Sequence, residues 1–351
     1  MPKLEIENLS RRFGTTTALD GVSLTVEEGA VTCLLGASGC GKSTTLRIVA
    51  GIETADDGDV RLDGSSILAA SPEARGIGLM FQDFALFPHL RVGENVAYGL
   101  RDKHTAKARV ASLLKRVGLS THIDKYPHEL SGGEQQRVAL ARAIAPKPGV
   151  MLMDEPFSGL DERLRDTVRD DTLAVLREEG TAIILVTHDP MEAMRMADEI
   201  ALMRAGRIIQ RGAPITMFNA PVDLEAARFF SDVNVLPGRV KGGVVETVFG
   251  PFVAQGHDEG SAVDIAIRPQ NVGIDFYRAR GAPRASGEEG SVAEGRVLRA
   301  RFLGQISEVD FDVDGLLIRT TLPGVFLPPV GRSFNLRIPR RHCHLFSRSG
   351  P

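Results

Sequence analysis

The sequence predicts an α/β domain with a largely parallel sheet over residues 1–234 and a small β-rich domain over residues 235–351. Up to about residue 230, short β-branched runs alternate with stretches of helical periodicity, which is typical of parallel α/β sheets. After about Val235 the helical periodicity fades, and short alternating runs broken by glycine replace it. The length of 351 residues is sufficient for two such domains.

Three short apolar runs in the first domain, at residues 31–35, 150–153 and 182–186, have the length of buried strands. Glycine or polar residues follow each run. Because parallel strands bring their carboxyl ends to one edge of a sheet, we expect residues that carry chemistry at these three strand ends.

Helices are predicted between and after these strands. Residues 44–50 follow the first strand, and residues 162–179 carry apolar side chains at helical spacing and end before Gly180. After the third strand, Asp189 is a predicted N-cap, Pro190 a first-turn proline, and Glu192 a carboxylate that caps in return.

The clearest element of the second domain is a hairpin. Val309, Phe311 and Val313 alternate before Asp314-Gly315, and the alternation resumes after this two-residue turn. Residues 279–290 are polar and rich in glycine, so we expect a mobile loop there.

Composition restricts the classes of function. Lys plus Arg number 42 and Asp plus Glu 45, so no overall positive charge favours nucleic acid. Three cysteines are too few for a disulfide framework, which indicates a reducing compartment. No secretory leader opens the chain, and no apolar run approaches the roughly 20 residues of a membrane helix. We therefore expect a cytosolic protein that reaches a membrane only through a partner.

A phosphate-binding loop follows the first strand and precedes a helix. Its glycines let backbone N–H groups surround phosphates, Lys42 reaches the β- and γ-phosphates, and Ser43 can ligate Mg²⁺. The alternative is a chance glycine-rich turn, which the flanking strand and helix disfavour. The predicted ATP-binding residues here are Gly36, Ala37, Ser38, Gly39, Cys40, Gly41, Lys42, Ser43 and Thr44.

Polar side chains lie at or just after the ends of the other predicted strands. Asp154 is predicted to hold Mg²⁺ and Glu155 to polarise the attacking water, although Asp-Glu-Pro could simply cap a strand. His188 could contact a γ-phosphate, and Gln82, after the run 77–81, could touch both metal and water. Taken separately, His188 and Gln82 could equally be surface residues.

A second glycine-bearing helix start, Ser131-Gly132-Gly133-Glu134, lies in the same domain. One nucleotide needs only one phosphate loop. The second element is explained if it closes over the nucleotide held by another copy, which predicts a head-to-tail homodimer. With this segment the chain resembles the ATP-binding-cassette (ABC) family, whose signature it matches.

The resemblance covers about residues 3–230 and includes every cassette element in order. It implies a P-loop NTPase cassette with a helical subdomain at about residues 85–145, and ATP and Mg²⁺ as cofactors. It further implies that Phe13 stacks on adenine, that Ser131 and Gly133 contact the γ-phosphate of the other subunit, and that Asp161 communicates across the dimer. Phe13 could otherwise be a core residue. The implied catalytic residues are Glu155, His188 and Gln82, and the implied magnesium ligands are Ser43, Gln82 and Asp154.

Within the family, a single cassette without a membrane span resembles the motors of importers. The tail, with residues 267–270 and 302–304, resembles the oligonucleotide-binding-type tail of maltose, polyamine and ferric-iron importers. The implied partners are two integral membrane permease subunits and, indirectly, an extracytoplasmic solute-binding protein. The implied location is peripheral, on the cytoplasmic face of the inner membrane. Residues 76–100 and 129–161 most resemble ferric-iron importers, so Fe(III) is the expected cargo and polyamine, sugar or another solute the alternative.

Other interpretations remain open from the sequence. Phe81, Phe84, Leu86 and Phe87 could form an apolar surface for a permease helix, or could belong to the core. The tail could bind nucleic acid, but it has few exposed-looking aromatics besides Phe252, Phe276 and Tyr277, and we expect no nucleic-acid partner. It could also be a regulatory or dimerisation platform. Residues 342–344 (His-Cys-His) could be interpreted as an iron sensor, but the side chains of three consecutive strand residues cannot all face one metal ion.

Overall fold

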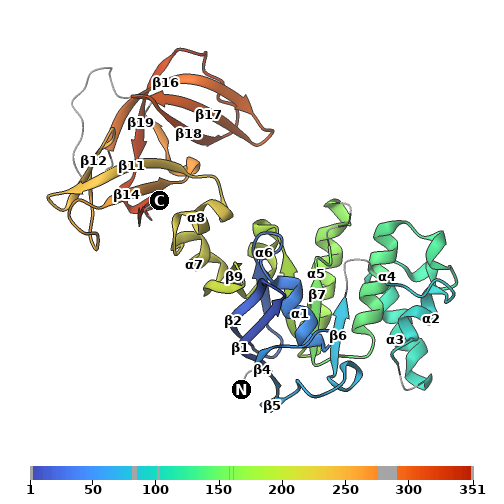
Figure 1. The fold of residues 1–351 in the computed structure, drawn as a ribbon. Helices are drawn as coiled ribbons and strands as arrows, with labels where there is room; N and C mark the ends of the chain where they lie inside the picture. Colours follow the sequence, from blue (N-terminus) through green and yellow to red (C-terminus); the bar gives the residue numbers. More distant parts are fainter. Residues whose placement is uncertain are drawn as a thin grey trace. The chain divides into compact units, whose positions relative to one another are not determined.

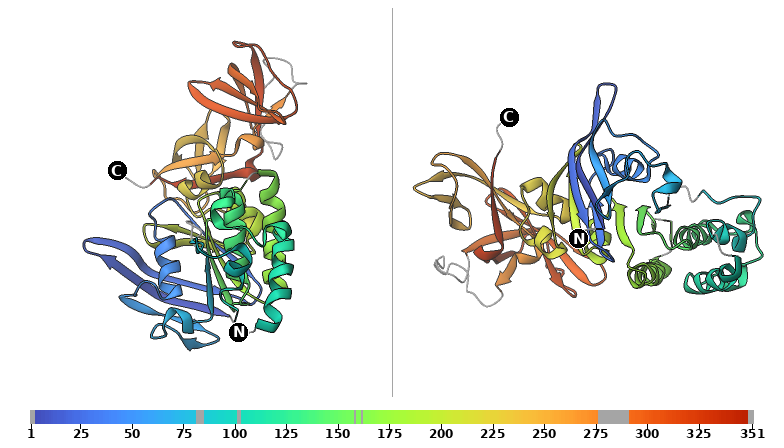
Figure 2. Two further views of the ribbon diagram at one scale, coloured as in Figure 1. Left: turned by 90° about the vertical axis from the view of Figure 1, so that its right-hand side faces the viewer. Right: turned by 90° about the horizontal axis from the view of Figure 1, so that it is seen from below.

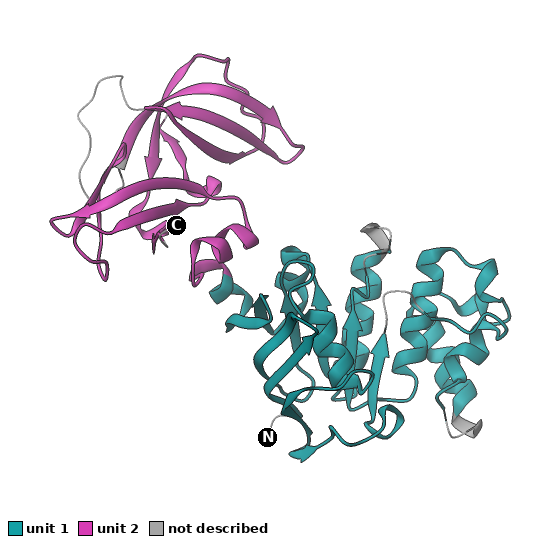
Figure 3. Ribbon diagram, viewed as in Figure 1, with its two compact units in different colours: residues 1–217 teal, residues 218–351 magenta. Residues whose placement is uncertain are grey.

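A computed structural model describes residues 3–80, 85–100, 103–157, 159–160, 162–275 and 291–348. The chain forms two compact units, Met1–Met217 and Phe218–Pro351 (Figure 3). The boundary between the two units lies before the boundary expected from the sequence at residue 234. The reason is that helix α8 (Leu224–Phe230) contacts strand β14 (Ala262–Ile267) of the second unit. The two predicted folds, α/β and then β-rich, are confirmed.

The central sheet of the first unit places three predicted strand ends side by side, because β3, β8 and β7 are neighbours in it. Strands β6, β7 and β9 of this sheet are labelled in Figure 1. Its order is β10-β9-β3-β8-β7-β6, and all neighbours are parallel except the antiparallel pair β9 and β10. All residues of β3 and β8 are buried, as expected for strands covered on both faces. The bounds are β3 Val31–Leu35, β6 Ile77–Met80, β7 Val150–Asp154, β8 Ala182–Thr187, β9 Glu199–Arg204 and β10 Arg207–Gly212.

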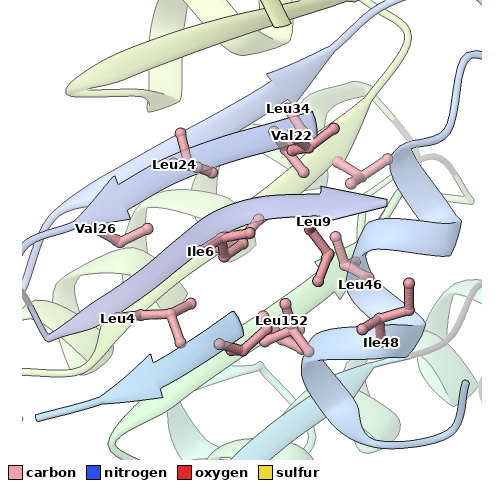
Figure 4. Close-up of a cluster of buried hydrophobic side chains, with 14 of the residues drawn as sticks. Leu4, Ile6, Leu9, Val22, Leu24, Val26, Leu34, Leu46, Ile48 and Leu152 are labelled. Atoms are coloured by element: carbon pink, nitrogen blue, oxygen red, sulfur yellow. The ribbon is translucent and has the colours of Figure 1, made fainter. Parts of the chain in front are cut away.

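An antiparallel sheet of order β2-β1-β4-β5 supplies the second layer of this unit. Leu4, Ile6 and Leu9 of β1 form one core cluster with Leu46 of helix α1 and Leu152 of β7 (Figure 4). This apolar core fixes α1, and with it the loop that precedes α1, against the end of β3. The bounds are β1 Leu4–Phe13, β2 Thr16–Val26, β4 Asp57–Leu62, β5 Ser65–Ser66 and α1 Lys42–Ala50.

Three helices form the helical subdomain that was expected at about residues 85–145. Helices α2 (Val92–Ala97), α3 (Lys103–Arg116) and α4 (Gly132–Ile144) contact one another, and they lie apart from β1 and β2 (Figures 1 and 2). Short 3-10 turns Ser120–His122 (η2) and Pro127–Glu129 (η3) connect α3 to α4, and Pro72–Ala74 (η1) precedes β6.

The predicted helix after the second strand is confirmed as α5 (Glu162–Glu178), and Gly180 follows it with φ +69°. Asp189 caps α6 (Pro190–Met196) by accepting hydrogen bonds from Met191 N and Glu192 N. The expected return contact of Glu192 is wrong. Its carboxylate accepts the Thr187 hydroxyl at 2.8 Å, and that hydroxyl accepts the Asp189 N–H, because Thr187 ends β8 beside the helix start.

The second unit has two antiparallel sheets around one apolar core, of orders β13-β12-β11-β14-β20 and β15-β19-β16-β17-β18. The predicted hairpin is confirmed, since Val313 of β17 pairs with Leu316 of β18 and Asp314-Gly315 form the turn with positive φ. The bounds are β11 Asn234–Lys241, β12 Val244–Thr247, β13 Gly250–Val253, β14 Ala262–Ile267, β15 Gly273–Asp275, β16 Ser291–Phe302, β17 Ile306–Val313, β18 Leu316–Pro323, β19 Ser333–Ile338 and β20 Cys343–Ser347, with 3-10 turns Pro269–Asn271 and Arg340–His342.

Two features of this unit concern the alternative interpretations of the tail, as a nucleic-acid-binding module and as an iron sensor. Phe252, expected to be exposed, is only 2% exposed and belongs to the core, because it lies on the inward face of β13. Phe276, Tyr277 and the predicted loop 279–290 lie outside the described residues. Cys343 and His344 are neighbours in β20, where successive side chains point to opposite faces, and the described residues contain no cluster of His, Cys, Asp or Glu able to hold a metal.

Candidate nucleotide-binding and hydrolysis site

The predicted phosphate loop runs from the end of β3 into α1, and two of its glycines are required by close backbone approach. A Cβ at Gly36 would lie 2.4 Å from the Met203 carbonyl oxygen, and one at Gly41 would lie 2.6 Å from the Ala18 carbonyl oxygen. Both residues have positive φ, +156° and +112°. Only glycine fits this path, so the sequence folds the loop tightly at the helix start. No acidic residue occupies the first turn of α1, which leaves the helix dipole available to an anion.

Lys42 lies inside this loop rather than on its surface. Its side chain is buried, and Nζ donates to the carbonyl oxygens of Gly36 at 2.7 Å and Ala37 at 2.9 Å. The loop therefore holds the ammonium in place by its own carbonyl groups. Cys40 is also buried, with Sγ 3.8 Å from Nζ, which agrees with its interpretation as a packing residue of the loop.

Glu155 and His188 meet at the ends of the neighbouring strands β7 and β8. The distance between Glu155 Oε1 and His188 Nδ1 is 2.6 Å. Glu155 has the unusual φ of +48°, and its N–H donates to the Val186 carbonyl oxygen at 3.0 Å. This backbone turn directs the carboxylate across the strand end to His188, whose side chain is 61% exposed and therefore accessible to a ligand. The two residues are 33 positions apart in the chain, and only the parallel pairing of β7 with β8 brings them together.

The residues present fit a magnesium ion bound with a nucleotide. Asp154 is the last residue of β7, and Ser43 is in the first turn of α1 behind the loop. Mg²⁺ in phosphate sites takes one or two protein ligands together with water and phosphate oxygens, so one carboxylate and one hydroxyl suffice. Gln82, the third predicted ligand, lies outside the described residues.

The predicted signature forms the start of α4, and Ser131 is its N-cap. The Ser131 N–H and hydroxyl both donate to Glu134 Oε2, at 2.7 and 2.8 Å, and Ser131 Oγ accepts the Glu134 N–H. Gly132 and Gly133 follow in the first turn, and a Cβ at Gly133 would meet only ordinary contacts, at 3.6 Å from Gly159 and Leu160. Steric demand within this chain therefore does not explain the glycine at residue 133.

The remaining predicted site residues divide into two groups. Phe13, at the end of β1, is 46% exposed, so the alternative that it belongs to the core is wrong, and the Arg11 guanidinium lies 4.9 Å from its ring centroid. Asp161 lies outside the described residues, as does Ser158.

Two residues near the site make contacts that were not predicted from the sequence. The Gln136 side-chain nitrogen, on α4, donates to the Pro156 carbonyl oxygen at 2.6 Å and so ties the signature helix to the residue after Glu155. The buried Arg75 donates to the carbonyl oxygens of Ile48 and Val49 at the end of α1 and to those of Leu68 and Ala70. Burial lowers the pKa of Arg75. Gln136 lies in the signature segment, residues 130–137, but the segment itself does not reveal the contact with Pro156. Arg75 belongs to no motif, so only its position as a polar residue before a strand could have signalled it.

A surface on the helical subdomain includes part of the apolar segment noted in the sequence. The rings of Phe87 and Tyr98 lie 4.3 Å apart, Tyr98 is 65% exposed, and the Arg142 guanidinium lies 5.3 Å from the Phe87 ring. Buried Asn95 fixes this segment, because it accepts the Phe87 N–H and donates to the carbonyl oxygens of Phe87, Leu90 and Arg91. Leu86 and Phe87 are half-buried, and Phe81 and Phe84 lie outside the described residues.

Comparison with known proteins identifies the family to which a chain with these motifs belongs. A profile of the family described as ABC transporter matches residues 19–158. The Fe(3+) ions import ATP-binding protein FbpC of Mesorhizobium japonicum is 39% identical over 94% of this chain and 89% of its own length. The chain belongs to the ABC transporter family of ATP-binding proteins. Such cassettes bind ATP with Mg²⁺ and hydrolyse it. This ABC protein carries the phosphate loop, Asp154 and the Glu155–His188 pair at neighbouring strand ends of one sheet.

Other relatives of this ABC protein carry different cargo names. The spermidine/putrescine import ATP-binding protein PotA of Chromobacterium violaceum is 38% identical over 95% of both chains. The sulfate/thiosulfate import ATP-binding protein CysA 2 of the same species is 44% identical over 81% of this chain and 78% of its own. Among solved structures, a dimeric ATP-binding cassette bound to ADP and Pi aligns with a TM-score of 0.55 and 29% identity, over 60% of this chain and 98% of that one.

Proposed function

We propose that two copies of this chain form a head-to-tail dimer that hydrolyses ATP between them and drives solute import through separate membrane subunits. The observation that carries the proposal is the Glu155–His188 pair beside the phosphate loop, in a chain whose relatives are named import ATP-binding proteins. A dimeric cassette among similar solved structures supports the pairing. Among the residues that the structure describes, no helix is long and apolar enough to span a membrane. A peripheral site on the cytoplasmic face of the inner membrane is part of the proposal.

The proposed roles in one protomer follow from the geometry. Lys42 exchanges its contacts with the loop carbonyls for the β- and γ-phosphates, because anionic oxygens are stronger acceptors. Ser43, Asp154 and Gln82 are the proposed magnesium ligands, and bound Mg²⁺ supplies charge neutralisation of the phosphates. The loop residues Gly36, Ala37, Ser38, Gly39, Cys40, Gly41 and Thr44 complete the cradle, and exposed Phe13 stacks on adenine.

Glu155 is the proposed general base, and His188 holds it in place until a γ-phosphate is present. The side chain of Glu155 is 21% exposed, so its oxygen is accessible to an attacking water. His188 donates to Glu155 in this structure when Nδ1 carries the proton, and its exposed ring can turn to a phosphate oxygen. Gln82 is proposed to orient the same water.

The partner's contribution to each site is proposed to come from Ser131, Gly132, Gly133 and Glu134, with Asp161 communicating between the two sites. The absence of a steric reason for glycine at residue 133 supports this role, because a phosphate approached by backbone N–H groups leaves no room for a side chain.

A substitution of Glu155 tests the catalytic proposal. Glu155→Gln keeps the size and the hydrogen bonding of the side chain but removes the base, so ATPase activity should fall by about 10² to 10⁴ while ATP binding is retained. Glu246→Gln, at an exposed residue of β12, is the matched control and should keep full activity. A Glu155→Gln enzyme with more than a tenth of normal turnover would contradict the assigned role.

The surface around Phe87 and Tyr98 is the proposed docking site for a permease helix. Tyr98 is largely exposed, and Asn95 holds the segment rigid, so a partner helix meets a preformed apolar surface. Phe87→Asp should leave soluble ATPase activity unchanged but release the protein from permease-containing membranes. Ile52→Asp, at an exposed apolar residue elsewhere on the unit, should not. Equal membrane recovery of the two variants would exclude this surface.

Fe(III) is the proposed cargo, in accord with the ferric-iron relatives that cover most of both chains. The described residues provide no metal cluster, so this subunit is not proposed to bind the cargo itself. Uptake of labelled ferric iron, putrescine, maltose and sulfate in cells carrying Glu155→Gln separates the candidates, because only the true cargo should lose its uptake. Unchanged ferric uptake would remove iron and leave the solute whose uptake falls.

The second unit is proposed as a regulatory or dimerisation platform without a nucleic-acid partner. Burial of Phe252 removes one of the few aromatics available for base stacking, which supports this view. ATPase activity stimulated by DNA or RNA, and unaffected by permease membranes, would reverse it.

A further inference from the structure

A histidine from outside the signature contacts the carboxylate on which the signature is built. His122, at the end of η2, places Nε2 at 3.2 Å from Glu134 Oε1. The other oxygen of the same carboxylate accepts both the N–H and the hydroxyl of Ser131. His122, Glu134 and Ser131 therefore form one chain of contacts from η2 to the first residue of the signature.

The hydroxyl of Ser131 is committed in this chain of contacts. A serine hydroxyl carries one proton, and that of Ser131 is donated to Glu134 Oε2 at 2.8 Å. The oxygens of an ionised γ-phosphate only accept hydrogen bonds. Ser131 must therefore release Glu134 before it can donate to a phosphate in the partner's site.

The charge of Glu134 opposes that exchange. Once the hydroxyl has turned away, the carboxylate has lost a donor, and a highly charged triphosphate lies near it. Hydrogen bonds from Ser131 lower the pKa of Glu134, with the larger effect from the Ser131 N–H and the smaller from its hydroxyl. The Glu134 carboxyl group is therefore an anion at neutral pH. The positive charges that act on it include those of His122, Lys125 and Arg137. Asp124, beside them, is paired with Arg91 at 3.8 Å.

We propose that His122 is a positioning residue whose positive charge neutralises Glu134, frees the Ser131 hydroxyl for the partner's γ-phosphate, and makes ATP-dependent dimerisation tighten as pH falls. The inference rests on the proposed head-to-tail dimer and adds to it a regulatory group outside the signature. Imidazole is the side chain whose charge depends on pH near neutrality, and in this structure the ring of His122 lies 3.2 Å from the Glu134 carboxylate.

The magnitude follows from the exposure of the pair. The side chains of His122 and Glu134 are 19% and 25% exposed, so the pair is partly solvated and changes an equilibrium constant by a factor of about 2 to 5. A head-to-tail dimer contains two such sites. Dimerisation should therefore be tighter by about 4- to 25-fold at pH 6 than at pH 8 through this pair.

The experiment measures the dimer dissociation constant by sedimentation with saturating Mg-ATP at pH 6 and pH 8. All proteins carry Glu155→Gln, so that ATP is not consumed. His122→Asn should reduce the pH dependence by the stated factor and dimerise weakly at both values. His122→Lys should dimerise tightly at both, because its charge is permanent, and this rescue is not expected of a residue with a purely structural role. Glu134→Gln should also lose the pH dependence that the pair provides.

His128→Asn is the matched control, because this exposed histidine stacks on Tyr126 and lies in the neighbouring turn η3. It should keep the full pH dependence. The nucleotide and all other ionisable groups are common to all the proteins, so only differences between variants report on His122. If His122→Asn and His128→Asn show the same pH dependence, the inference is wrong although the dimer stands. If no variant dimerises with ATP, the proposed dimer itself fails.

Discussion

Replacing Gly41 by alanine should damage the phosphate loop far more than the same change at Gly39. Both residues have positive φ, +112° and +79°, which costs alanine about 1–2 kcal/mol at either position. At Gly41 the new Cβ would also lie 2.6 Å from the Ala18 carbonyl oxygen and 2.8 Å from Leu19 Cδ2, whereas at Gly39 nothing lies within 4 Å. A backbone carbonyl cannot move aside, so the clash adds about 1–3 kcal/mol.

Thermal unfolding of the nucleotide-free proteins measures this difference. A unit of about 200 residues loses roughly 2–4 °C per kcal/mol, so the first unit of Gly41→Ala should melt about 2–12 °C below that of Gly39→Ala. The transition that ATP shifts in the unmodified protein identifies the first unit. Equal melting temperatures for the two variants would show that β2 does not constrain the loop as the structure indicates, and the steric reasoning would be refuted.

Three further predictions concern polar groups. Arg75→Met removes a donor from four carbonyl oxygens, of which that of Ile48 keeps the Gly51 N–H, and should lower the free energy of unfolding in urea by about 2–5 kcal/mol. A loss below about 1 kcal/mol would contradict the role of Arg75 at the end of α1. Asn95→Ala should cost about 1–3 kcal/mol and also weaken membrane recovery, and a stable variant that still docks normally would show that Asn95 does not organise the Phe87 segment. Hydrogen bonds, chiefly from the Ser66 hydroxyl, lower the pKa of Asp59 in the folded state. Its stabilising effect is therefore complete above the unfolded value of about 3.9 and is lost as pH falls through the lower folded value, so Asp59→Asn should flatten the acid limb of stability against pH. An unchanged acid limb would exclude that contribution.

The local part of the site could be predicted from the sequence. The three loop glycines with Lys42, the strand before them and the helix after them are contiguous, and their chemistry depends on backbone path over a few residues. The same holds for Ser131 with Glu134, a capping pair at helical spacing, and for the Asp314-Gly315 hairpin. Ordered motifs also led to the family, because their sequence along the chain is distinctive.

Contacts between distant segments could not be predicted in this way. Periodicity indicates that 150–153 and 182–186 are strands, but it does not give their order, and only the pairing of β7 with β8 sets Glu155 against His188. The predicted capping contact of Glu192 was wrong although it is local, since the Asp189 N–H donates to the Thr187 hydroxyl, which in turn donates to the Glu192 carboxylate. From the sequence Phe252 was expected to be exposed, but the second unit's sheet places its side chain in the core.

The amino-acid sequence by itself indicated which segments are suited to binding phosphate, because a tight glycine path and a helix start are properties of neighbouring residues. The tertiary structure alone decided which groups lie in contact: Glu155 with His188, Arg75 with the end of α1, and His122 with Glu134. The physical reason is that a hydrogen bond or ion pair depends on a separation of a few ångströms, and for residues far apart in the chain that separation is fixed by strand order and core packing.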